Sequence, residues 1–437
     1  MRLLAPSTRR RHSPAPWAAL GLLLLNLLAE PVLASTETVP VSVTIGDLLK
    51  IVREKSPRFA VMLQRIETAR AEVVAAGVLP NPTISYGRYD FVGGGANHMF
   101  DGNAQEQVTL EVPLLIAGQR GARIEAAEKG VTAAEADVEA EYAALVHETR
   151  RLFVKLLAEQ ERVAIFEETA RDMQHLAAIV TGRKDAGNAS SFDELRIGVE
   201  ASGIETKLET ARNDLAETVG DLGVLLGMPD WKPAAVGKLA VLGVPADAQK
   251  LLAEAQVSNP DIVAAQRSES AADAGLEKAR RERWPAVSVQ VGTVYTDSPY
   301  SNTTFGGVSV EVPIFDRNQG GMAKAEAAKH AAMLEHDFAT SRTRVAIDRA
   351  VNLLVRRQET RVKFEKDVLS KLNSLKSMGE SAYRFGKGTI LELLDSYRSR
   401  TEMRLTEVDL IQAETEAELD ALRASGQLLS YLNATPD

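Results

Sequence analysis

The stretch Glu311-Val312-Pro313-Ile314-Phe315-Asp316-Arg317-Asn318-Gln319-Gly320 begins like an earlier one, Glu111-Val112-Pro113-Leu114, which lies 200 positions before it. Three further pairs of stretches recur in the same order, with spacings of 203, 205 and 199 residues: Ser56-Pro57-Arg58 with Asn259-Pro260-Asp261, Leu79-Pro80 with Trp284-Pro285, and Ala186-Gly187 with Phe385-Gly386. Such order and spacing indicate an internal duplication. We therefore expect a first repeat, 35–227, a Pro- and Gly-bearing linker, 228–246, and a second repeat, 247–437.

Each repeat is expected to contain a helix, two strands, a very long helix, a turn and a last helix. The first helices, about 46–78 and 247–283, end where a proline forbids continuation. The long helices are predicted from the absence of Gly and Pro over 51 residues (131–181) and 57 residues (322–378). A helix over roughly 119–182 would be ~95 Å long. Its apolar positions form a seam with the 3.5-residue period of a coiled coil. The corresponding apolar seam of the second long helix is interrupted at Gln358 and Arg361.

The strands show alternating apolar and polar residues. The apolar positions are Val287, Val289, Val291, Val308, Val310 and Val312 in the second repeat and Val108, Leu110 and Val112 in the first. Strands of this length and pattern are typical of membrane β-strands, for which we expect the valines of the second repeat to face lipid. Four strands cannot close a barrel, and a bilayer tolerates no open edge, so several protomers would have to contribute. A small soluble sheet between two coiled-coil arms is the alternative.

The N-terminus and the charge indicate export. Four arginines precede an apolar stretch, 17–28, and Val32-Leu33-Ala34 offers small residues for cleavage after Ala34, so residues 1–34 are expected to be a signal peptide. The alternative of a membrane anchor is disfavoured because the apolar stretch is short and Pro31 breaks it. The net charge of -9 becomes more negative on cleavage, which disfavours nucleic-acid binding. The absence of cysteine excludes disulfides and a lipidated cysteine.

No enzyme signature accompanies the histidines. The five that follow the signal peptide are His98, His147, His175, His330 and His336, and no HExxH, P-loop or GxSxG motif is present. His330 and His336 are six positions apart and do not form an i, i+4 metal pair on a helix. The pair His98-Met99 is more typical of a surface loop than of a cation site. We therefore expect no catalytic residue, no cofactor and no metal ligand.

One polar cluster follows the second long helix. It contains Tyr383, Gly386, Gly388, Thr389, Glu392 and Asp395. The glycines would permit a turn, and Thr389 would cap the next helix. Glu392 and Asp395 would share one helical face, where acids are also favoured by the helix dipole without any function.

Several stretches resemble the TolC-type outer membrane efflux proteins, and most closely their cobalt-zinc-cadmium branch. They are Gly77-Val78-Leu79-Pro80-Asn81-Pro82, Glu111 to Leu114, Glu311 to Gly320, and Gly386-Lys387-Gly388-Thr389. The resemblance spans 40–430. It implies a mainly helical homotrimer, in which four strands per chain build a 12-stranded outer-membrane β-barrel on a periplasmic barrel of long helices. It also implies a periplasmic adaptor protein and an inner-membrane pump as partners.

The resemblance assigns roles to the two helix–helix turns. It implies that Glu392 and Asp395 form rings that narrow the periplasmic end of the tunnel, with Tyr383 in the gate network. The turns would meet the adaptor through Lys184, Gly187, Gly386, Lys387, Gly388 and Thr389. Two departures bear on this: Gly388 stands where relatives have Arg, and Arg196 is the first-repeat match of Asp395.

The function expected from these observations is a passive exit duct, driven by its inner-membrane partner and exporting heavy-metal cations or small toxic compounds. A duct for protein secretion remains an alternative because the pump largely selects the substrate. A soluble periplasmic coiled-coil adaptor is an alternative of a different class. An exported hydrolase has no motif to support it.

Overall fold

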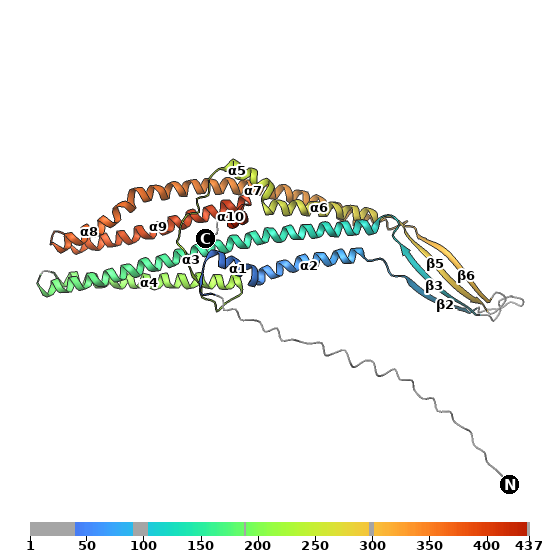
Figure 1. Ribbon diagram of the computed structural model, residues 1–437, viewed down its shortest axis with the longest axis horizontal. Helices are drawn as coiled ribbons and strands as arrows, with labels where there is room; N and C mark the ends of the chain where they lie inside the picture. Colours follow the sequence, from blue (N-terminus) through green and yellow to red (C-terminus); the bar gives the residue numbers. More distant parts are fainter. Residues whose placement is uncertain (1–39, 91–103, 188, 297–300, 435–437) are drawn as a thin grey trace, which may run out of the picture. The chain divides into compact units, whose positions relative to one another are not determined.

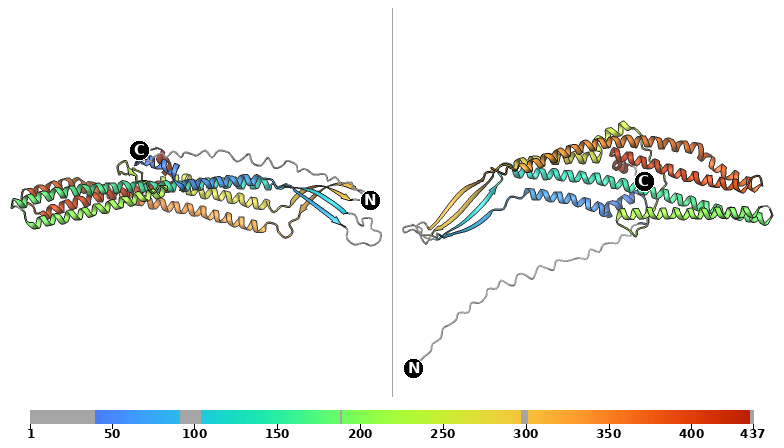
Figure 2. Two further views of the ribbon diagram at one scale, coloured as in Figure 1. Left: turned by 90° about the horizontal axis from the view of Figure 1, so that it is seen from below. Right: turned by 180° about the vertical axis from the view of Figure 1, so that it is seen from behind.

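The computed structural model describes residues 40–90, 104–187, 189–296 and 301–434. The predicted signal peptide and the pair His98-Met99 lie outside these residues. From Val41 onward the chain forms one unit (Figures 1 and 2). The helices are α1 (Ile45–Lys55), α2 (Pro57–Gly77), α3 (Gln119–Asp185), α4 (Ser191–Leu226), α5 (Ala248–Ser258), α6 (Pro260–Arg281), α7 (Gln319–Phe364), the π-helix η1 (Glu365–Leu369), α8 (Ser370–Arg384), α9 (Ile390–Ser425) and α10 (Leu428–Ala434). The strands are β1 (Ser42–Val43), β2 (Thr83–Asp90), β3 (Ala104–Leu114), β4 (Ala234–Ala235), β5 (Ala286–Thr296) and β6 (Ser301–Glu311).

The predicted first helix of each repeat is wrong in one respect, because each is two helices. The break falls at Ser56 between α1 and α2 and at Asn259 between α5 and α6, and both residues precede a proline. Proline disfavours the α region for the residue before it, and both residues accordingly have an extended ψ, 119° and 118°. The same prolines then occupy the first position of α2 and α6, where a missing N–H costs nothing.

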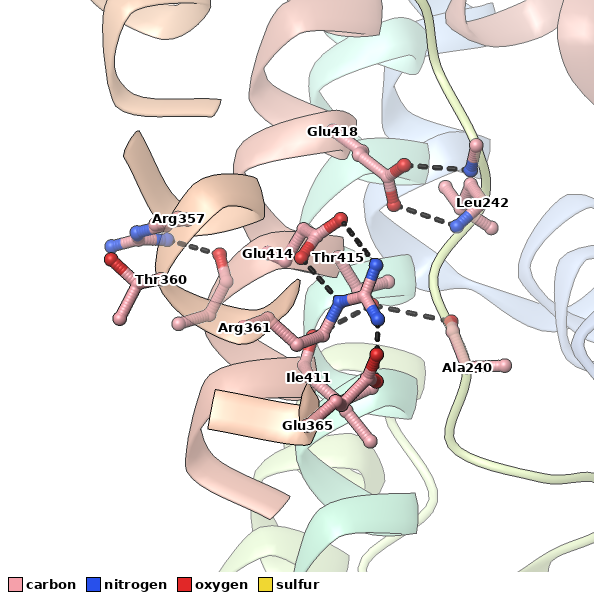
Figure 3. Close-up of polar contacts among 12 residues, drawn as sticks. Ala240, Leu242, Arg357, Thr360, Arg361, Glu365, Ile411, Glu414, Thr415 and Glu418 are labelled. Carbon is pink, nitrogen blue, oxygen red and sulfur yellow. Dashed lines mark hydrogen bonds and ion pairs between the residues drawn. The ribbon is translucent and has the colours of Figure 1, made fainter. Parts of the chain in front are cut away.

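The long helix of the first repeat is continuous, whereas that of the second is interrupted. α3 runs for 67 residues, about 100 Å. In the second repeat α7 ends at Phe364, and five residues of π-helix separate it from α8. Arg361 lies just before this π-helix and pairs with the buried Glu414 of α9 at 2.6 Å and with Glu365 at 2.5 Å (Figure 3). The seam interruption predicted at Arg361 is therefore an ion-pair site beside a change of helix type.

Four strands form one antiparallel sheet in the order β2-β3-β5-β6, which confirms the four predicted strands. Their register places the predicted apolar residues on one face: Leu110 lies opposite Val291, and Val289 lies opposite Val308. The other face carries polar pairs such as Ser288 with Ser309. Val312 lies just beyond the end of β6. Strands β2 and β6 are the edges of the sheet and have no outer neighbour among the described residues.

α3 packs against helices from both repeats, with α2 and α4 of the first and α6 and α9 of the second. The linker packs against α3 and α9 and is fixed there by Glu418, which is 2% exposed. Its carboxylate accepts the backbone N–H groups of Leu242, Gly243 and Val244 at 2.6, 2.7 and 3.0 Å (Figure 3). Burial raises the pKa of Glu418, and these three hydrogen bonds oppose that rise. Strand β1 pairs in parallel with β4, so Ser42–Val43 is also held against the linker.

None of the helices in the described part of the chain is long and apolar enough to cross a membrane.

Candidate functional site

The candidate site consists of the turn between α3 and α4 and the turn between α8 and α9. Both turns lie at the same end of the helices, away from the strands (Figure 1). A cluster of buried side chains from all four helices joins them, and its members are Met173, Leu176, Val180, Ile197, Ile204, Tyr383, Ile390, Leu393, Leu394 and Tyr397. The two predicted turns are therefore packed on one core.

The first turn contains Lys184 and Gly187. Gly187 has φ 77°, in the left-handed region that glycine enters without strain, and ends α3. Ser190 begins α4 with a capping box, in which its hydroxyl accepts the Asp193 N–H and the Asp193 carboxylate accepts the Ser190 N–H. Lys184 donates to Glu194 at 2.5 Å, and this hydrogen bond raises the pKa of Lys184.

The second turn has the same backbone construction. Gly386 has φ 70°, and the N–H groups of Gly386 and Lys387 donate to the carbonyls of Tyr383 and Ala382 at 3.1 and 2.8 Å. Gly388 does not have a positive φ, and its N–H donates to the Ala382 carbonyl at 3.0 Å. It is small because a Cβ there would lie 3.1 Å from the Ala382 Cβ. The predicted cap is present, since the hydroxyl of Thr389 accepts the Glu392 N–H at 3.3 Å.

Tyr383 belongs to the core of the site and is 5% exposed. The guanidinium of Arg183 on α3 lies 4.5 Å from the centroid of its ring and donates to its backbone carbonyl. Burial raises the pKa of Tyr383, and the Arg183 charge opposes that rise. The hydroxyl has no hydrogen-bond partner among the described residues. Arg183 and Tyr383 therefore form one contact that joins the two turns.

Glu392 and Asp395 are exposed at the start of α9. The Glu392 carboxylate accepts the Thr389 N–H at 2.8 Å, which completes the second capping box. Glu392 therefore acts as a helix-start residue that caps α9, and a gating role would be additional to this one. Asp395 forms no ion pair among the described residues, so its carboxylate is open to solvent on this surface.

Charged pairs hold α8 and α9 against α3 and α4 above the turns. Lys376 of α8 binds Asp172 of α3 at 2.6 Å, and Arg398 of α9 binds Glu200 of α4 at 2.7 Å. Burial alone would raise the pKa of Glu168, but hydrogen bonds from Arg400 and Arg404 lower it to about 2. These pairs are partly buried, so solvent screens them less than exposed pairs.

The sequence did not reveal Arg183, because a lone arginine near a helix end is also typical of a simple helix cap. The repeat makes Lys184 the counterpart of Tyr383, 199 residues later, but equivalence between repeats does not show which side chains meet. In the described part of the chain, no group of three or more His, Asp or Glu side chains is placed to hold a metal ion.

Comparisons with known proteins confirm the resemblance. Residues 48–228 and 251–427 match the family model described as outer membrane efflux protein. The cobalt-zinc-cadmium resistance protein CzcC of Cupriavidus metallidurans is 26% identical over 349 residues, which are 78% of this chain and 80% of CzcC. The pyoverdine export outer membrane protein OpmQ of Pseudomonas putida is 23% identical over 408 residues, 87% of this chain and 85% of OpmQ.

The fold is that of solved channels. A crystal structure of CusC superimposes with a TM-score of 0.71 at 20% identity, covering 87% of this chain and 92% of that one. The mainly helical fold class with a four-stranded sheet is therefore confirmed. The names of these relatives describe resistance, export and channel formation, not catalysis. Because the family model matches most of the chain, this protein belongs to the outer membrane efflux protein family, whose members are outer-membrane channels with a periplasmic helical domain.

Proposed function

We propose that the chain acts as a homotrimeric exit duct of a tripartite system that exports heavy-metal cations. The observation that carries the trimer is the four-stranded sheet, whose edge strands β2 and β6 have no outer neighbour among the residues that the structure describes. Strands β2 and β6 run in opposite directions, so β6 of one copy can pair with β2 of the next in an antiparallel ladder. Three copies would give 12 strands, and closure removes the edges that lipid does not tolerate.

The cation cargo rests on relatives and on charge. CzcC is named for resistance to cobalt, zinc and cadmium, and this chain covers most of its length. Glu392 and Asp395 present carboxylates at the end of the duct that, in the proposed trimer, would gather around one axis. A ring of like charges in a narrow passage raises the local concentration of cations. OpmQ favours a second candidate cargo, an organic compound of the kind that its name describes, pyoverdine.

The two turns are proposed to meet the periplasmic adaptor, and the Arg183–Tyr383 contact to hold the gate closed. The apolar side chains exposed at the start of α4 support a docking role, since Phe192, Leu195 and Val199 are 60%, 68% and 64% exposed and share one helical face. Lys184 lies at the first turn, where it pairs with Glu194 of α4, and Lys387 lies in the second turn. The proposed duct is built from two repeats, residues 35–227 and 247–437, which are joined by the linker 228–246.

The cargo is tested in a deletion strain complemented with the chain. Growth in cobalt, zinc and cadmium salts is measured together with the metal content of the cells. We expect the wild type to lower the metal content of the cells and E392Q/D395N to lower it only slightly. E359Q/E402Q is the matched control, because both residues are exposed acids without an ion pair among the described residues. Unchanged metal content with the wild type, together with altered tolerance to organic compounds, would favour the second cargo.

A further inference from the structure

A cavity of about 400 Å³ lies between the linker, the start of α1 and the helices α3 and α9. Cavities that bind small molecules have this size and a predominantly apolar lining. None of the described residues that line it belongs to the two turns or to the sheet, so the cavity is separate from the site described above. The apolar part of its lining includes Ile45, Phe153, Leu157, Leu239, Leu242 and Leu419.

The linker wall of the cavity is fixed on both sides by hydrogen bonds. On one side, the Gln160 side chain donates to the Ala235 carbonyl at 3.2 Å and accepts the Ala235 N–H at 2.8 Å. On the other side, the Ala240 carbonyl accepts the Thr415 hydroxyl at 3.2 Å (Figure 3). An empty apolar space loses packing contacts, so a segment that is free to move would close it. Because both ends of 236–239 are anchored, the cavity is a preformed space that a ligand can enter.

The charged side chains of the lining are both cationic. Arg150 is 8% exposed and lies on the same face of α3 as Phe153 and Leu157, whereas Lys238 of the linker is exposed. None of the described residues that line the cavity is an Asp or a Glu, in a chain whose net charge is -9. This combination of an apolar lining with two cations fits an apolar molecule that carries a negative charge.

The carboxylates that adjoin the lining do not cancel these charges by pairing with them. Asp47 accepts the Thr44 N–H at 3.1 Å, and Glu418 accepts the Leu242 N–H at 2.6 Å. A guanidinium carries five N–H donors, so Arg150 can bind a carboxylate in addition to its other contacts. Such a hydrogen bond between two charged groups is stronger than one between neutral groups.

We propose that this cavity binds a medium-chain alkanoate, a carboxylate group on an unbranched apolar chain. The chain would lie among the apolar side chains of α3, α9 and the linker, and the carboxylate would bind Arg150 and Lys238. The lining comes from the start of α1, from the linker and from helices of both repeats, so the ligand would join all of these segments. A ligand that binds the folded form in this way stabilises it by mass action.

The first test measures protection of the linker in the full-length mature protein, assembled in lipid nanodiscs. Hydrogen exchange of 236–244 is followed during titration with dodecanoate or with 1-dodecanol, its uncharged match, and equilibrium dialysis gives the free ligand concentration. We expect dodecanoate to slow the exchange of these amides. Dodecanol should need a concentration at least about tenfold higher, because hydrogen bonds to charged groups contribute roughly tenfold or more in binding. Amides of α8 should not change with either ligand.

The second test uses variants that assign the binding to the cavity. R150Q should weaken protection by dodecanoate roughly tenfold and leave protection by dodecanol unchanged. K238Q keeps the buried part of the cavity intact and should have a smaller effect in the same direction, since water screens an exposed lysine. K232Q is the matched control, because Lys232 is an exposed lysine of the same linker that does not line the cavity. L157W fills the cavity and should abolish protection by both ligands.

Four outcomes would overturn the proposal. Equal protection by dodecanoate and dodecanol would show that the cations do not recognise the ligand. An effect of K232Q as large as that of K238Q, or unchanged protection in L157W, would place the ligand elsewhere. Protection that appears only after residues 35–39 are removed would assign the cavity to that N-terminal segment. Each outcome is measured on the linker, so none depends on the cargo.

Discussion

The Arg183–Tyr383 contact allows a direct test of how the two helix–helix turns are held together. In R183Q the guanidinium is lost from both the ring and the backbone carbonyl of Tyr383. A partly exposed cation–π contact contributes about 0.5–1 kcal/mol, and a hydrogen bond from a charged donor about 1.5 kcal/mol. Their sum, about 2 kcal/mol, corresponds to roughly thirtyfold in the equilibrium for local opening.

Hydrogen exchange on the assembled protein measures this equilibrium. Amides of 376–389 should exchange roughly thirtyfold faster in R183Q, and those of α2 should not change, because local opening determines exchange. In planar bilayers the same variant should show a higher conductance of the closed state. R183K should be intermediate, since an ammonium keeps the charge without the planar stacking group.

Two variants make the reasoning refutable. R171Q removes another arginine of α3 that is exposed and not ion-paired among the described residues, and it should behave as the wild type. Y383F should also be close to the wild type, because the hydroxyl has no partner among the described residues. Equal exchange in R183Q and the wild type, or equal acceleration in R171Q, would show that Arg183 is an ordinary helix-end residue. A strong effect of Y383F would show that the hydroxyl binds a group outside this chain.

E392Q/D395N should abolish cation preference in single-channel recordings. The melting temperature should stay within a few degrees, because glutamine still completes the capping box. Unchanged selectivity in an intact assembly would refute the gate role. V310R should lower the free energy of unfolding from the bilayer by roughly 2–4 kcal/mol per subunit, whereas S309R on the opposite face should be tolerated. Urea titration in vesicles measures both. Glu168, whose pKa lies near 2 when folded, contributes stability that is present above its ordinary value of 4.5 and is lost as pH falls from there toward 2. E168Q should therefore flatten the acid side of the stability profile, and an unchanged profile would show that solvent screens these pairs.

The sequence predicted the parts of the fold that depend on periodicity and on the repeat. Alternation located the strands, and absence of Gly and Pro located the long helices. The breaks before Pro57 and Pro260 are also predictable, because the residue before a proline avoids the helical region. The expectation of one continuous helix in each place did not take this into account.

Features that depend on partners distant in the sequence could not be predicted. The π-helix at Glu365–Leu369 follows an ion pair of Arg361 with a glutamate 53 positions away. Arg183 meets Tyr383 across 200 positions. In both cases the residue type is common on exposed helices, and only the packing of the two repeats shows which side chain it meets. The capping boxes at Ser190 and Thr389, in contrast, are local and were within reach of sequence reasoning.

The burial of the two long helices supplies an argument for assembly that is independent of the sheet. α3 buries side chains along its whole length, from Gln119 to Val180, because helices of both repeats surround it. In α7 the buried side chains are confined to 339–354, and the large apolar side chains of Leu334, Phe338 and Val345, which share one helical face, are 57%, 57% and 66% exposed. An apolar helix face of this length is stable in water only when another surface covers it. The unfilled face of α7 and the free edge of β6 adjoin along the chain, so one neighbouring copy can satisfy both, which is the arrangement the proposed trimer requires.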